Sequence, residues 1–142
     1  MRQQRDGTFD ALTQLKDAGL VAADGAATAG GQARIIDLGA ARMDGRIVVD
    51  VTAVEVASGD EGYRIRAQFS DSPTFASGIV NGAELVLGDT SVTGSSADSG
   101  AGRYEFAFTN EQNGVVYRYM RLFTDVQGTI ATGIDYSAYI IK

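Results

Sequence analysis

The sequence has no cysteine and no histidine in its 142 residues. Without cysteine, the chain can form neither a disulfide scaffold nor a thiolate metal site. Without histidine, it lacks the most common general base and metal ligand, and it cannot assemble a Ser-His or Cys-His nucleophile. We therefore expect a protein that is not an enzyme, and we assign no catalytic residue, no cofactor and no metal.

Positive charge and long apolar runs are also scarce. The net charge is −6, whereas a domain that binds nucleic acid is usually basic. No stretch approaches the roughly 18 apolar residues of a membrane span, and the charged N-terminus has no apolar signal-peptide core. We therefore expect no nucleic-acid partner and no membrane partner, and synthesis in the cytosol.

Proline occurs once and glycine 18 times, a composition typical of a chain rich in turns. From Ala33 onward, apolar residues recur at every second position, which predicts strands. Turns separate these strands every 8 to 12 residues, so the pattern favours an antiparallel sandwich or barrel of about seven or eight strands. The strands are expected at 33–39, 46–57, 61–70, 83–87 and 103–110, followed by two long strands within 115–142 that reverse at Gln127-Gly128.

The first 32 residues differ from the rest. Phe9, Leu12 and Leu15 recur at three-residue spacing, which favours a short helix. The following segment is rich in alanine and glycine, and it is either a frayed terminus or an arm that orders only against a partner. We therefore divide the chain into an N-terminal arm, residues 1–32, and a sandwich domain, residues 33–142. The arm is expected to be the more mobile part of the free protein.

Most of the 18 acidic residues lie at expected turns, where turn chemistry explains them without a functional role. A pair of carboxylates could serve a glycoside hydrolase, but the sequence distinguishes no such pair. The turn aspartates also lack the spacing of a calcium loop.

The strand expected at 115–127 is apolar on both faces, although a soluble sheet normally leaves one face to water. One face would hold Met120 and Leu122, and the other would hold Tyr117, Tyr119, Arg121 and Phe123. Two tyrosines and a phenylalanine beside an arginine are typical of interface hot spots. Either the arm or a loop of the same subunit covers this face, or another chain does, and a second subunit is the favoured cover. The candidate interface residues are Tyr117, Tyr119, Arg121 and Phe123, with Phe9, Leu12 and Leu15 from the arm.

Three segments also carry a family resemblance, in this order and at this spacing. They are QLKDAGLVAADGAATAGGQARIIDLG (14–39), IRAQFSDSPTFASG (65–78) and VVYRYMRLFTDVQGTIATGIDYSAYI (115–140). The matching elements are RIIDLG, the step Q-x-SDS-x-x-F and the ending RYMRL-x-x-x-V-x-GT. Together they resemble the jelly-roll capsid cement (decoration) proteins of tailed bacteriophages, over nearly the whole chain from about Leu15.

This resemblance implies a small jelly-roll β-sandwich that lies on the outer surface of a phage head after synthesis in the host cytoplasm. Such a protein would bind the major capsid protein, associate with copies of itself as a homodimer or homotrimer, and stabilise the shell against the pressure of packaged DNA. The absence of catalytic residues and the acidic charge agree with this role.

A carbohydrate-binding β-sandwich, such as a virion adhesin, is the alternative. Tyr104, Tyr117 or Tyr119 would then stack on sugar rings, although the absence of tryptophan weakens this interpretation. A glycoside hydrolase is a third interpretation, for which the sequence offers no carboxylate pair.

Overall fold

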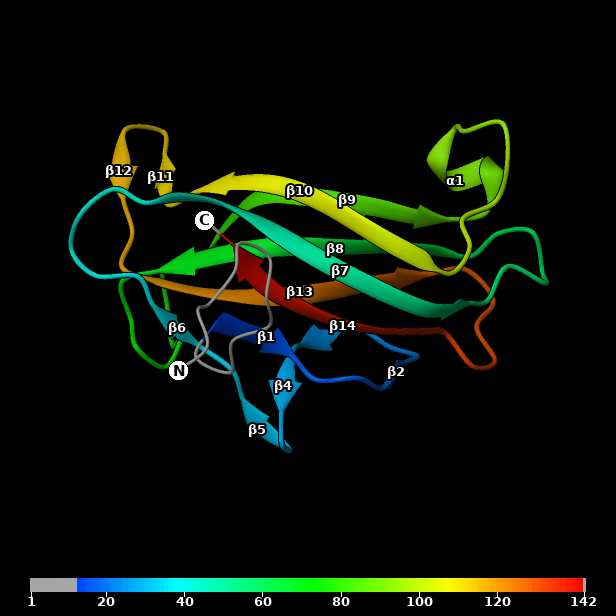
Figure 1. The fold of residues 1–142 in the computed structure, drawn as a ribbon, viewed down its shortest axis with the longest axis horizontal. Coiled ribbons are helices and arrows are strands. Elements are labelled where there is room, and N and C mark those ends of the chain that lie inside the picture. The colour runs from blue at the N-terminus through cyan, green and yellow to red at the C-terminus, as the bar shows by residue number, and fades with distance from the viewer. Residues whose placement is uncertain (1–12, 142) are drawn as a thin grey trace, which may run out of the picture.

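The computed structural model describes residues 13–141, and these form two antiparallel sheets that pack face to face (Figure 1). The all-β sandwich expected from the sequence is therefore confirmed. Sheet A has the order β1-β14-β7-β10, with β2 also beside β14. Its strands are β1 (Gln14–Lys16), β2 (Leu20–Val21), β7 (Asp44–Val54), β10 (Gly102–Thr109) and β14 (Ile134–Ile141).

Sheet B has the order β3-β13-β8-β9, with β6 also beside β13. When the eight strands on the two main paths are numbered along the chain, sheet A reads 1-8-3-6 and sheet B reads 2-7-4-5. This alternation between sheets is the strand order of a jelly roll, two Greek keys of eight strands. The strands of sheet B are β3 (Gly25–Ala26), β6 (Ile36–Asp37), β8 (Gly62–Ser70), β9 (Val80–Gly88) and β13 (Tyr119–Gln127).

Two small hairpins and one short helix lie outside the two sheets (Figure 1). The hairpin at Asn113-Gly114 was expected, and both residues have the positive φ angles, 53° and 81°, that a type I′ turn requires. The helix is too short to have been predicted, and within residues 13–141 no helix could cross a membrane. These elements are β4 (Thr28–Ala29) with β5 (Gln32–Ala33), β11 (Glu111–Gln112) with β12 (Val115–Val116), and α1 (Thr90–Thr93).

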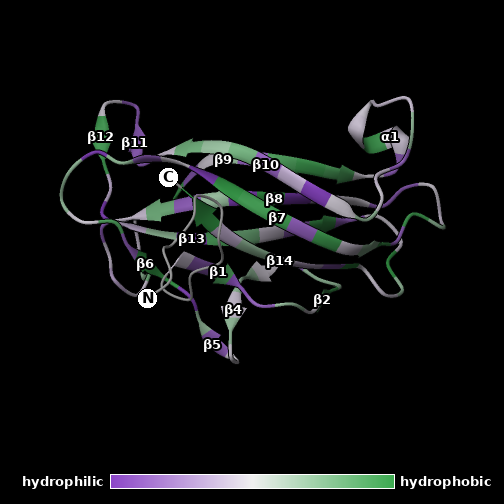
Figure 2. Ribbon diagram, in the orientation of Figure 1, coloured by the Kyte–Doolittle hydropathy of each residue, from purple (hydrophilic) through white to green (hydrophobic). Residues whose placement is uncertain are grey.

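The interior consists of the apolar side chains that alternate along the long strands. Figure 2 shows hydrophobic and hydrophilic bands along these strands, as expected when each strand has one buried face. One buried polar contact crosses between the sheets, where the Thr124 and Tyr136 hydroxyls lie 2.6 Å apart. Burial raises the pKa of Tyr136 to about 12. The core includes Ile47, Val49, Val51, Tyr63, Ile65, Ala67, Phe69, Phe108, Met120, Leu122, Ile134, Tyr136, Ala138 and Ile140.

The described part of the expected arm is built into the sandwich. β1 extends sheet A and β3 extends sheet B, so the division between residues 32 and 33 does not mark an edge of the fold. Leu15 lies in β1, not in a helix, and it is completely buried in the core. Leu15 is therefore a core residue and not an interface candidate. Phe9, Leu12 and most of the expected helix lie outside the described residues.

The long strand expected at 115–127 is interrupted. Val115 and Val116 pair with β11, and the chain then turns at Tyr117 and Arg118 before β13 begins. β13 and β14 are joined by the longer loop 128–133, not by a tight turn at Gln127-Gly128. The break separates Tyr117 from the three other candidate residues that follow it.

Candidate interaction surface

The outer face of sheet B is defined by the β13 residues that alternate with buried Met120, Leu122 and Thr124. Tyr119, Arg121, Phe123 and Asp125 therefore point away from the sandwich interior, and each is half-buried. Across the sheet, these residues face Ser70, Gln68, Arg66 and Arg64 of β8 in turn, and β9 adds Glu84 beside Arg66.

Phe75 is also part of this face, although it belongs to the loop after β8. Its ring lies 4.5 Å from the guanidinium carbon of Arg121, in cation–π geometry. Phe75 is only 5% exposed and is not part of the interior cluster, so its ring is buried against the outside of the sheet. The Arg121 Nε also donates to the Gln68 side-chain oxygen at 2.9 Å. The side chain of Arg121 is therefore held between Phe75 and Gln68.

Serine hydroxyls build the loop that positions Phe75. The Ser70 hydroxyl donates to the Ser77 carbonyl at 2.8 Å and accepts from the Ser72 amide at 3.0 Å. The Ser72 hydroxyl accepts from the Ala76 amide at 3.2 Å, and the Phe75 amide donates to the Ser72 carbonyl at 3.1 Å. These bonds hold Phe75 at φ 55°, in the left-handed region that a bulky residue rarely adopts.

Ion pairs cross the rest of this face. Arg66 donates to Asp125 at 2.8 Å and lies 3.5 Å from Glu84, which also accepts from Arg64 at 3.0 Å. All four side chains are partly buried by their neighbours. The charges of these four side chains are thus matched within one subunit, whereas Arg121 contacts the neutral side chains of Phe75 and Gln68. Tyr119 and Phe123 are the main apolar side chains on the rest of the face.

A further ion pair lies where the chain enters β13. Arg118 makes two parallel hydrogen bonds to Asp37 of β6, each 2.9 Å long. The paired guanidinium lowers the pKa of the Asp37 carboxyl, and the carboxylate raises the pKa of Arg118. The Arg118 guanidinium also lies 5.5 Å from the centre of the Tyr119 ring. This contact ties one face of Tyr119 to the same subunit.

The three segments that carry the family resemblance therefore meet on this face. RIIDLG supplies Asp37, the Q-x-SDS-x-x-F step supplies Gln68 and Phe75, and RYMRL supplies Arg118 and Arg121. The sequence identified Tyr119, Arg121 and Phe123 as one outward face, and the structure brings these three together. Tyr117 is not on it, since its side chain packs against the sandwich core.

The sequence reasoning missed Phe75 and Gln68 as members of the surface. Both residues belong to the step Q-x-SDS-x-x-F that carries the resemblance, and Ser70 and Ser72 before Phe75 have short hydroxyl side chains that favour tight turns. The outward position of Gln68 follows from alternation along its strand. Its contact with Arg121, however, depends on the register between β8 and β13, which the sequence does not specify.

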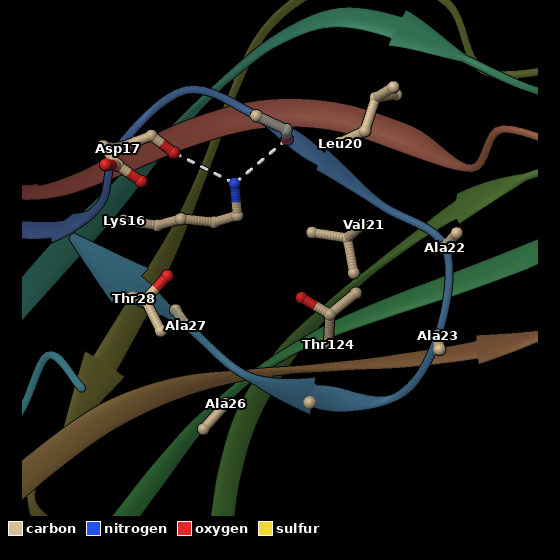
Figure 3. Close-up of a pocket in the computed structure, with 12 residues that line it drawn as sticks. Lys16, Asp17, Leu20, Val21, Ala22, Ala23, Ala26, Ala27, Thr28 and Thr124 are labelled. Atoms are coloured by element: carbon tan, nitrogen blue, oxygen red, sulfur yellow. Dashed lines mark hydrogen bonds between the residues drawn. The ribbon is translucent and has the colours of Figure 1, made fainter. Parts of the chain in front are cut away.

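A pocket beside β1 was also not foreseen. A cavity of about 330 Å³ lies between the segment 17–28, which includes β2 and β3, and Thr124 (Figure 3). Its one buried cation is Lys16, whose ammonium donates to the carbonyls of Asp17, Gly19 and Tyr136 at 2.8 to 3.1 Å. Burial lowers the pKa of Lys16. Because all three ammonium protons are used, Lys16 closes this loop and presents no free amine to the cavity.

No cluster of three carboxylates that could hold a metal ion occurs within residues 13–141. The outer face of sheet B combines ion pairs with aromatic and arginine side chains, and aromatic residues and arginine are enriched in protein interfaces. In comparisons with known proteins, no family model matches this chain, and no curated protein is significantly similar to it.

Proposed function

We propose that this protein is a capsid cement (decoration) protein that binds the outside of a bacteriophage head. The observation that carries the proposal is the meeting of the three resembling segments on one face, where they hold Tyr119, Arg121 and Phe123 in place. A role in assembly would explain why the three segments meet on a surface to which we assign no catalytic residue.

The outer face of sheet B has the properties of a protein contact. Aromatic residues and arginine are enriched in interface hot spots. Arg66, Asp125 and Glu84 are already paired within the subunit, so docking would bury no unpaired charge at these three residues. Arg121 is held between Phe75 and Gln68, and less side-chain freedom is therefore lost on binding.

The partners in this proposal are the major capsid protein and copies of the same chain, on the outer surface of the virion. A protein that binds the assembled shell and not its separated subunits stabilises the shell by mass action. At a free concentration 100 times the dissociation constant, each site contributes about 2.7 kcal/mol. No nucleic acid or membrane takes part, in keeping with the net charge of −6.

Heating of particles tests the role. Particles that carry the protein should release their DNA at a higher temperature than particles from which it has been removed, and adding purified protein back should restore the difference. The purified protein should show no measurable affinity for DNA at physiological salt. Equal release temperatures with and without the protein would overturn the proposal.

Tyr119→Ala tests the surface. If Tyr119 is central to the contact, the substitution should weaken binding to the capsid by about 1–3 kcal/mol, measured by co-sedimentation with capsids. Thr52→Ala, an exposed position on the opposite sheet, is the matched control and should bind as the unmodified protein does. Equal binding by both variants would remove Tyr119 from the interface.

The alternative, a carbohydrate-binding sandwich, has less support. Tyr104 lies in β10, Tyr117 packs against the core, and the Tyr119 ring is in contact with Arg118. The three rings therefore do not form a common stacking platform. A glycan-binding screen separates the two proposals, since an adhesin would bind a glycan and leave the release temperature unchanged.

A further inference from the structure

The edges of the two sheets are protected unequally. An edge strand exposes unpaired backbone amides and carbonyls, and natural sheets shorten, bend or cover such edges to prevent unwanted pairing. β1 is three residues long and has a register shift, while β3 and β6 have two residues each. β9 is longer, but its register with β8 is also broken between Arg66 and Gln68. These edges are poor templates for another strand.

β10 is the exception among the described edges. It pairs with β7 over eight consecutive residues without a register shift, and no other described strand pairs with its far side. It contains no proline. In Figure 1 it forms the margin of sheet A, between the projecting β11–β12 hairpin and α1. Tyr104 and Phe106 are half-buried along it, while Arg103 and Glu105 are exposed on the outer side of the sheet. A long and regular edge of this kind is ready to accept a strand.

The charges on β10 identify a second copy of β10 as the fitting strand. In an isologous contact, residue i meets residue j and residue j meets residue i. If two antiparallel copies meet at a two-fold axis through Tyr104, Arg103 lies opposite Glu105 of the other copy, and the reverse pair forms as well. Opposite charges directly across a sheet are stabilising, and like charges are destabilising.

Other self-pairings lack this match. Within one subunit, Glu105 lies 3.0 Å from Arg46 and 3.6 Å from Arg103. An axis through Glu105 would place the two Glu105 side chains opposite each other, and an axis through Phe106 would add no opposite charge from the second copy to Arg103 or Glu105. On β9 the only charged residue is Glu84. Pairing of two copies of β9 about Glu84 would therefore place the two Glu84 carboxylates opposite each other. The electrostatic pattern thus selects both the strand and its register.

We infer that two copies of this protein associate through β10, in antiparallel register about Tyr104, and join their A sheets into one continuous sheet. The inference deepens the proposed function, in which the chain contacts copies of itself, and it resolves that contact as a dimer. It also leaves the outer face of sheet B free for the major capsid protein. The dimer is tested with purified protein alone. The dimer inference can therefore fail while capsid binding and thermal protection are confirmed, and the cement function can fail while the dimer is confirmed.

Charge reversal is the first test. Arg103→Glu and Glu105→Arg should each weaken dimerisation by about tenfold or more, because two-fold symmetry creates two like-charge contacts at once. The double variant Arg103→Glu/Glu105→Arg should recover dimerisation. Sedimentation equilibrium over a wide concentration range measures the constants, and circular dichroism confirms that each variant folds. A strictly monomeric unmodified protein, a trimer, or single variants that associate normally would overturn the inference.

Cysteine cross-linking tests the register independently, since the natural chain has no cysteine. Residues directly opposite in an antiparallel pair have Cα atoms about 4.5 to 5.5 Å apart, within disulfide range. Tyr104→Cys should therefore form a covalent dimer on mild oxidation. Ala107→Cys, an exposed site on the same strand, would face residue 101 and not itself, and should remain uncross-linked. Dimers from Ala107→Cys and none from Tyr104→Cys would exclude this register.

Discussion

The carboxylates of the loops and those on the outer face of sheet B have different partners. In the loops they accept hydrogen bonds from backbone amides, as when Glu55 accepts from Ala131, Thr132 and Gly133 at 2.7 to 3.0 Å. On the sheet they pair with arginine side chains. The loop group also includes Asp17, Asp24, Asp60, Glu61, Asp71, Asp89 and Asp98.

These two structural roles account for many of the acidic residues, so no binding site is needed to explain them. A loop exposes backbone amides that no strand satisfies, and a carboxylate accepts from them more strongly than a neutral oxygen does. In a regular strand, the backbone amides on the paired side already donate to the neighbouring strand. A carboxylate on the sheet therefore accepts hydrogen bonds from side chains instead. Loss of a loop carboxylate should therefore affect folding more than loss of a sheet ion pair.

Glu61→Ala should give the largest effect. The Glu61 side chain is fully buried and accepts from the amides of Ser58 and Asp60 at 2.8 and 3.1 Å. Removal would lose two charge-assisted bonds and leave a void, at a cost of about 3 kcal/mol in the free energy of unfolding. Chemical denaturation measures the loss. Glu61→Gln keeps one acceptor oxygen and should lose less, whereas a loss below about 1 kcal/mol for the alanine variant would contradict the argument.

Acid should release the loop 128–133 by protonating Glu55. Hydrogen bonds from Gly133 and then Thr132 lower the pKa of Glu55 below its ordinary value of 4.5. The stabilisation is therefore complete above that value and is lost as the pH falls through the lower pKa of the folded protein. Amide exchange at 131–133, corrected for its intrinsic pH dependence, should accelerate in this window. Glu55→Gln should abolish the acid response, and an unchanged response in that variant would assign it to another carboxylate.

Arg66→Met should give the smallest effect. Its ion pairs with Asp125 and Glu84 are only partly buried, at 22% exposure for Arg66 and 31% and 34% for its partners. We expect a loss of about 0.5–1 kcal/mol that shrinks at high salt. Arg46→Met removes the more exposed pair with Glu105, where Arg46 is 52% exposed, and should have almost no effect. If both variants lose the same free energy of unfolding, the burial of an ion pair does not determine its contribution to stability.

The sequence predicted the sandwich because apolar and polar residues alternate along strands such as β8, which indicates that one face of the strand is buried. It also identified the Asn113-Gly114 turn, whose φ angles few other residue pairs adopt. It failed where a contact joins distant segments. Ala and Gly in residues 14–32 gave no strand signal, yet backbone pairing with β13 and β14 orders β1, β2 and β3 there. Tyr117 was misplaced because the break after β12 depends on pairing with β11, not on periodicity.

The position of β14 also constrains when the protein can fold. β14 is the last described strand of the chain, but it lies inside sheet A, between β1 and β7 (Figure 1). During synthesis, β1 and β7 have no neighbour in common until β14 leaves the ribosome. Such long-range pairing is slow and exposes unpaired strands meanwhile. Sheet A should therefore close only after β14 has been synthesised, and a chain truncated before β14 should aggregate instead of forming a smaller sandwich.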